Sequence, residues 1–118
     1  MLIKFKDIFT HFILFSGEYD SPKAALEYIV KNNIRLQTAD LTNLNLMNAK
    51  LSKGSFRCCD FSDCYMNGVD LSYSDCQGAN FANANFENGN INYMDAREAQ
   101  FSCCNMTNTK QIGVIIDG

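Results

Sequence analysis

A strict five-residue period runs through the second part of this chain and limits what it can fold into. From Leu36 to Met106, every fifth residue has a side chain without polar character, over fifteen consecutive positions. The residue two before is mostly small and the residue one before is often Asp or Asn, as in GANFANANFENGNI at 78–91. A helix needs apolar residues three and four apart and a strand needs them two apart, so neither explains the period.

A chain that turns a corner after every five residues does explain it. Four such sides make a square coil of twenty residues, and successive coils stack at the strand spacing of about 4.8 Å. Each side is too short to bury anything alone, so neighbouring coils supply the core. We expect the following residues to form the core stack along the axis: Leu41, Phe61, Phe81, Phe101, Phe56, Phe86, Leu71 and Ile91.

The repeated unit resembles the A(D/N)LXX motif of the pentapeptide-repeat family. The resemblance covers residues 34–110, about two thirds of the chain, in an unbroken register. It implies a mainly β protein whose repeats form a right-handed quadrilateral β-helix of about four coils.

Residues 1–33 lie outside the repeat and have a different pattern. The apolar runs LIKF and FILF around a polar turn predict a β-hairpin. The stretch SPKAALEYIVKNN predicts a helix over 22–32, with Ser21 as N-cap and Pro22 at the first helical position. The combination resembles N-terminal extensions of some bacterial and phage members of the family, although His11 stands where Gly would be commoner. We expect this segment to cover the first coil.

The C-terminal residues 111–118, QIGVIIDG, form a third segment. The five-residue register fades after Met106, while Ile112, Val114, Ile115 and Ile116 are too apolar to leave in water. An open end of stacked strands also exposes unpaired backbone groups. These residues either fold over the last coil as a cap or join a second subunit. We favour a homodimer through this end, since some family members pair there.

Six cysteines invite a disulfide or metal reading, but their spacing argues against both. No CxxC pair is present, and the only His, His11, is far from the cysteines in sequence. In the coil, Cys59, Cys64, Cys76 and Cys104 fall at inward positions, where cysteine acts as a small apolar filler. Free thiols suit the reducing cytoplasm of a bacterial or phage-infected cell. Cys58 and Cys103 fall at outer positions, and whether they are reactive stays open. We expect no cofactor and no metal.

Two outer faces are candidate partner surfaces. Asp40, Asp60 and Asp63 make one of them acidic, and Tyr73 and Tyr93 stack on another. Exposed tyrosines can anchor a protein partner, and the sequence does not decide between the two faces.

The remaining outer positions predict contacts within the coil. Arg57 and Arg97 lie near Asp75 and Asp95 and are expected to form charge pairs, with Arg35 in the same column. A further column is expected to form a hydrogen-bonded ladder and consists of Asn45, Tyr65, Asn85 and Asn105.

No pattern of residues points to catalysis. The sequence has one His, no nucleophile beside a base and no Gly-rich phosphate loop, so we expect a protein that is not an enzyme. A net charge of −3 is too small to suggest direct nucleic-acid binding, and no segment reaches the ~18 apolar residues that span a bilayer. We therefore expect a protein partner. The protein could be a phage-type inhibitor or decoy that blocks a host nuclease or defence complex.

The alternative is a DNA mimic that inhibits DNA gyrase, as the Qnr and MfpA members of the family do. Residues 34–118 contain nine acidic and six basic residues, hence −3. Four coils span ~19 Å, and B-DNA of that length carries ~11 negative charges. The chain supplies about a quarter of that field, which favours the first reading.

Overall fold

A β-hairpin begins the computed structural model, which describes residues 1–117. Strand β1 (Leu2–Lys6) pairs antiparallel with β2 (Ile13–Glu18), and Phe5 lies opposite Phe15. The Asp7 carboxylate accepts hydrogen bonds from the backbone N–H groups of Phe9 (2.8 Å) and Thr10 (2.9 Å), and this orders the tip. The predicted hairpin is confirmed. His11 has a φ of 62°, the left-handed conformation that glycine adopts most easily.

Helix α1 (Pro22–Lys31) follows the hairpin and confirms the predicted helix to within one residue. The Ser21 Oγ accepts a hydrogen bond of 3.0 Å from the Ala24 N–H, which makes Ser21 the N-cap. Asn32 is the C-cap, and Asn33 leaves the helix with a left-handed φ of 56°. The apolar face of α1 is buried in the same core as the inward strand residues.

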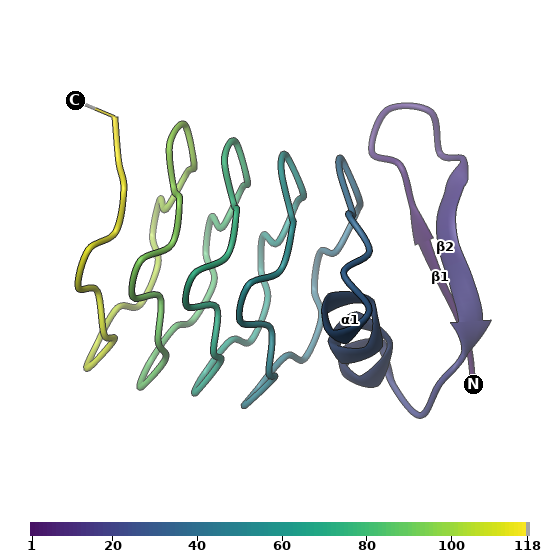
Figure 1. Cartoon of the computed structure of the whole chain (residues 1–118), viewed down its shortest axis with the longest axis horizontal. Helices are drawn as coiled ribbons and strands as arrows, with labels where there is room; N and C mark the ends of the chain where they lie inside the picture. The colour runs from purple at the N-terminus through teal and green to yellow at the C-terminus, as the bar shows by residue number, and fades with distance from the viewer. Residues whose placement is uncertain (118) are drawn as a thin grey trace.

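Beyond α1 the chain winds in successive coils that lie side by side along the long axis (Figure 1). Isolated parallel bridges join residues twenty apart, from Arg35–Ser55 to Asp95–Ile115, as the five-residue register predicts. They divide the chain into coils 35–54, 55–74, 75–94 and 95–114. Only one residue per side is bridged, so the sides are too short to count as strands of their own.

Each corner of a coil is a tight turn with one residue in the left-handed conformation. These residues recur every fifth position from Thr38 to Gly113, with φ between 55° and 69°. Asn fills five of the positions, consistent with its tolerance of this conformation: Asn43, Asn48, Asn83, Asn88 and Asn108. In the sequence these positions are recognisable only as outer ones, and the five-residue period does not reveal the need for a left-handed conformation.

Large apolar side chains fill the inside of the coils. Phe81 stacks on Phe61 with ring centroids 5.1 Å apart and on Phe101 at 5.2 Å, with interplanar angles of 9° and 14°. Of the expected core stack, all residues except Phe101 are at most 1% exposed. Phe101 belongs to the last coil and is half-buried.

The expectation that the register fades after Met106 is wrong. The Ile91 N–H donates to the Lys110 carbonyl (2.9 Å), and the Ala96 N–H donates to the Ile115 carbonyl (2.8 Å). Residues 111–114 therefore complete the fourth coil, and Ile115 pairs with its first residue, Asp95, so these residues do not form a separate segment. The five-residue pattern ends in the sequence because Gln111 is polar at a position where the repeat has an apolar residue. The backbone pairing continues because it does not depend on that side chain. Gly118 lies outside the described residues.

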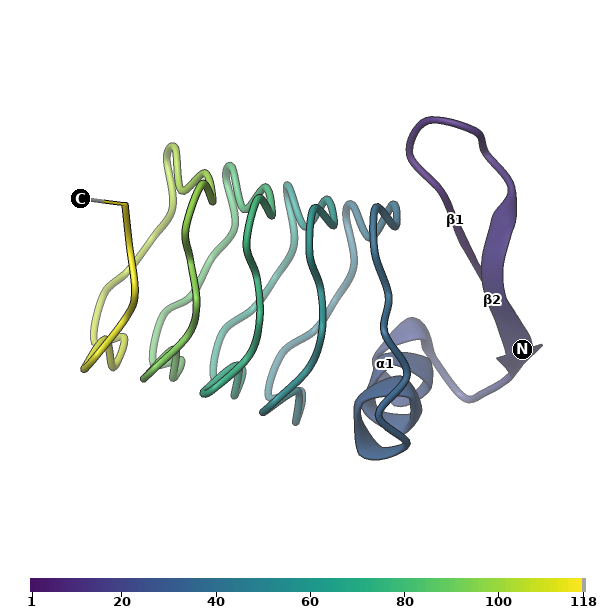
Figure 2. The same ribbon diagram turned by 45° about the horizontal axis from the view of Figure 1, so that its top comes forward.

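The hairpin and α1 lie together at one end of the stack, and the C-terminus lies at the other (Figure 2). At the N-terminal end Asp7 and Ala39 form an antiparallel bridge, and the Ile8 N–H donates to the Thr38 carbonyl (2.8 Å). Helix α1 contacts another side of the first coil, where the Lys50 N–H donates to the Glu27 carboxylate (2.8 Å).

Candidate functional site

The Asp and Asn side chains that precede the inward residues hydrogen bond to their own turns. The Asp60 Oδ1 accepts from the Ser62 N–H (2.9 Å) and the Asn85 Oδ1 from the Glu87 N–H (3.0 Å). The same bond to the N–H two residues later recurs at these positions: Asp40, Asn45, Asp60, Asp70, Asp75, Asn80, Asn85, Asn90, Asp95 and Asn105. This part of the motif is therefore needed for the turns themselves.

These hydrogen bonds to the turns involve residues of two predicted outer faces, the acidic face and the column that contains Asn45 and Asn85. Asp40 and Asp60 hold their own turns, so part of the expected acidic face serves the fold. The expected side-chain ladder is wrong, because Asn45, Asn85 and Asn105 bond to the turns that follow them, and the ladder in their column is formed by the backbone.

The two candidate partner surfaces lie on different sides of the coil. Asp40 and Asp60 share one bridge column, and Asp63 lies in the turn that follows. Tyr73 lies ten residues after Asp63, which is half a coil. The acidic face and the tyrosine face therefore cannot act as one continuous surface.

Tyr73 and Tyr93 form an exposed aromatic stack. Their ring centroids are 5.0 Å apart with an interplanar angle of 17°, and about half of each side chain is exposed. Gly113 lies next in the column, and a Cβ there would come within 2.4 Å of the Tyr93 ring. The absence of a side chain at Gly113 thus leaves room for the Tyr93 ring.

The expected charge pairs form on a third side. The Arg57 Nε lies 2.7 Å from the Asp75 carboxylate, and an Arg97 terminal nitrogen lies 2.7 Å from the Asp95 carboxylate. The hydrogen bond from Arg97 lowers the pKa of Asp95. Two carboxylates are thereby balanced by neighbouring cations, which weakens the negative field around the coils.

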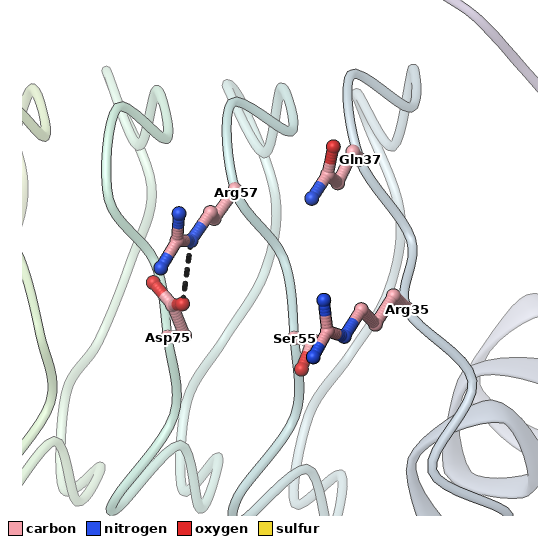
Figure 3. Close-up of a pocket in the computed structure, with 5 residues that line it drawn as sticks. All are labelled: Arg35, Gln37, Ser55, Arg57 and Asp75. Atoms are coloured by element: carbon pink, nitrogen blue, oxygen red, sulfur yellow. Dashed lines mark hydrogen bonds and ion pairs between the residues drawn. The ribbon is translucent and has the colours of Figure 1, made fainter.

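A polar pocket of about 140 Å³ lies on the same side, between the first coils (Figure 3). It is lined by Arg35, Gln37, Ser55, Arg57 and Asp75. Arg57 contacts Asp75, whereas no carboxylate of residues 1–117 forms an ion pair with Arg35. The charge pair was predicted from the sequence, but the pocket was not. The available signal was that Arg35 and Ser55 interrupt the run of Asp and Asn in two successive coils.

The inward cysteines do more than fill space. The thiols of Cys59, Cys64 and Cys104 donate to backbone carbonyls at 2.8 to 2.9 Å, each to a residue twenty-three positions earlier. Burial raises the pKa of Cys59 and Cys76 to about 12, so these thiols are unreactive near neutral pH. All six cysteines are free, and Cys58 and Cys103 are exposed.

The described part of the chain holds no cluster of three or more His, Cys, Asp or Glu side chains suited to a metal ion. Within residues 1–117, no helix combines the length and apolar character needed to cross a bilayer.

Comparison with known families identifies the class of protein. The family model described as pentapeptide repeats (8 copies) matches over residues 32–68, 55–88, 64–99 and 79–110. These matches extend over more than half of the sequence, and the chain belongs to the pentapeptide-repeat family. Proteins of this family fold as right-handed quadrilateral β-helices. A comparison with curated protein sequences finds no match.

Three solved structures illustrate the range of similarity. The pentapeptide repeat protein alr5209 from Nostoc Pcc 7120 is 17% identical, with a TM-score of 0.55, over 80% of this chain and 85% of that protein. Rfr23 from the cyanobacterium Cyanothece 51142 is 22% identical, with a TM-score of 0.35, over 97% and 74%. QnrB1, a plasmid-mediated fluoroquinolone resistance protein, is 15% identical, with a TM-score of 0.21, over 70% and 62%. The likeness to alr5209 supports the fold alone, and the other two scores are too low to support an argument.

Proposed function

We propose that this protein is a non-enzymatic interaction protein of the cytoplasm that binds other proteins. We infer that its coils form the right-handed quadrilateral β-helix of the family, a rigid frame with different side chains on each side. The observation that carries the proposal is the uncovered apolar end of the last coil.

That end exposes apolar side chains that the described residues do not cover. Ile112, Ile115 and Ile116 are 66%, 49% and 68% exposed, and Val114 is half-buried. Among residues 1–117, no further coil pairs with the outer backbone groups of the last coil, and unpaired strand edges favour association. Two copies that meet at this end would cover both apolar ends at once, so we propose an end-to-end homodimer.

The dimer is tested by the molar mass in solution, measured by light scattering. The wild-type protein is expected at twice the chain mass of 13.3 kDa, and Ile115→Lys at the chain mass. Leu2→Lys is a matched control, because Leu2 is 55% exposed at the other end of the stack and its variant should stay dimeric. A wild-type monomer, or a dimeric Ile115→Lys variant, would contradict this interface.

The target that we propose is a protein rather than a nucleic acid. The net charge of −3 gives no attraction to a polyanion. The stacked Tyr73 and Tyr93 rings offer a rigid, half-exposed anchor of the kind that binding hot spots use. The hairpin and helix resemble extensions on phage members of the family, which favours an inhibitor or decoy of a host nuclease or defence complex.

A pull-down from bacterial lysate with three baits tests the binding surface. The baits are the wild-type protein, the double variant Tyr73→Ala with Tyr93→Ala, and Asp63→Asn. We expect one stoichiometric partner that the tyrosine variant loses and the Asp63→Asn variant keeps. The reverse pattern would move the site to the acidic face.

The alternative function is inhibition of DNA gyrase by mimicry of DNA. Residues 34–118 contain seven Asp and two Glu against six basic residues, and two of these Asp residues form ion pairs with arginines. The field is thus far weaker than that of B-DNA of the same length. A supercoiling assay separates the two functions, since inhibition at micromolar protein would favour the mimic.

A further inference from the structure

One column of the coil lacks the Asp or Asn side chain that binds the turn amide in two successive coils, whereas the other columns lack it only at separated positions: Lys50, Tyr65, Gln100 and Lys110. In coils three and four, Asp75 and Asp95 accept the N–H groups of Gln77 and Arg97, both at 3.3 Å. In coils one and two, Arg35 and Ser55 occupy the equivalent positions. The corresponding N–H groups of Gln37 and Arg57 have no hydrogen-bond acceptor among residues 1–117.

Gln37 and Arg57 both line the polar pocket between these coils. Figure 3 shows the Arg35 and Gln37 side chains extending from the first coil towards the second, and the Arg57 side chain extending from the second coil to Asp75 on the third. Arg57 contacts Asp75 through Nε, so its two terminal nitrogens are available. Two guanidinium groups against one carboxylate leave the pocket with one excess positive charge.

We propose that this pocket binds a carboxylate group. The ligand would supply the acceptor oxygen that Asp and Asn supply at the other turns, and would take its hydrogen bonds from the free amides. The planar fork of a guanidinium matches the two oxygens of a carboxylate. A single negative charge balances the pocket, whereas a dianionic phosphate would face repulsion from Asp75. The carboxylate belongs either to a small free acid or to an Asp or Glu side chain of a protein partner.

Titration with sodium acetate, followed by ¹H–¹⁵N NMR spectra, tests the site. Sodium chloride at the same ionic strength is the reference. The amide signals of Gln37 and Arg57 should shift saturably with acetate and not with chloride. The amides of Thr42 and Ser62, which already bind Asp40 and Asp60, should not shift. The absence of a saturable shift at Gln37 and Arg57 would overturn the proposal, as would tighter binding of phosphate than of acetate.

Two variants make the test specific. Ser55→Asp places a carboxylate where Asp75 and Asp95 stand in later coils, so it should occupy the Arg57 amide and weaken acetate binding by about tenfold or more. Arg35→Gln removes one guanidinium and should weaken it similarly. Arg97→Gln removes an arginine of the same column outside the pocket, so acetate binding should be unchanged. An unaltered acetate response in both Ser55→Asp and Arg35→Gln would contradict the site.

A peptide with one Asp between neutral residues separates the two ligand sources. Tighter binding than acetate would assign the site to a partner side chain, and equal binding would assign it to a small free acid. Both results uphold a carboxylate site. The test does not involve the C-terminal end, so its failure and that of the proposed dimer are distinguishable.

Discussion

The two ends of the coil stack differ in how their apolar side chains are covered. At the N-terminal end, Phe5, Leu26 and Ile29 from the hairpin and α1 are buried in the core of the coils. At the C-terminal end, Phe101 and Met106 point into the last coil but are only half-buried. The repeat therefore provides burial between coils but not at the ends. Each end needs something that the repeat does not encode, which is either added chain or another molecule.

The middle of the stack gives the reference for this comparison, because it depends on neither end. Phe81 is fully buried between Phe61 and Phe101. We expect Phe81→Asp to unfold the protein, with a loss of more than about 4 kcal/mol, because a large side chain is lost and an unpaired charge is buried. Phe81→Leu is the control and should cost about 1.5 kcal/mol, since Leu41 fills the same column. Thermal unfolding by circular dichroism measures both, and a cooperative wild-type melt for Phe81→Asp would show that the core stack does not hold the fold.

The second expectation compares the two ends directly. Leu26→Ala removes a fully buried side chain under the N-terminal cover and should cost about 2–5 kcal/mol. Met106→Ala removes a side chain that is partly exposed to water in the monomer. In dilute solution it should therefore lower the free energy of unfolding by less than about 2 kcal/mol. Denaturant unfolding at two protein concentrations measures the losses. If a second copy covers the open end, the cost of Met106→Ala should rise with concentration while that of Leu26→Ala stays constant. Equal costs at all concentrations would remove the difference between the ends.

The sequence predicts the parts of this fold that depend on side-chain periodicity. Inward residues such as Phe61 and Phe81 are recognised by spacing alone, and α1 by the cap at Ser21 and Pro22. Periodicity fails where the backbone continues without its usual side chain. Gln111 stands at an inward position, so the register was expected to end early, although Ile115 still pairs with Asp95.

The candidate sites are less predictable, because they depend on which hydrogen bonds are missing. The sequence shows that Arg35 and Ser55 replace Asp or Asn, but not that those residues normally bind the next turn amide. Only the bonds at Asp75 and Asp95 reveal what Gln37 and Arg57 lack. The separation of the tyrosine and acidic faces was predicted from the sequence, because it follows from counting twenty residues to a coil.

The smallest expected effect concerns the hydrogen bonds of Asp7, which join the hairpin to the first coil. The C-terminal end has no equivalent link among the described residues. Asp7 accepts hydrogen bonds from the Thr38 hydroxyl and from the amides of Thr10 and Phe9, and these lower its pKa from 3.8 to about 2. Because the folded pKa lies below the unfolded one, this stabilisation is complete above pH 3.8 and is lost as the pH falls towards 2.

Asp7→Asn should therefore lower the melting temperature near pH 7 by a few degrees or less, and the difference from wild type should shrink below pH 4. Asp63→Asn is the control, because it removes the same charge from an exposed turn of the second coil. A gap between Asp7→Asn and wild type that stays constant down to pH 2 would mean that the carboxylate does not hold the N-terminal cover in place.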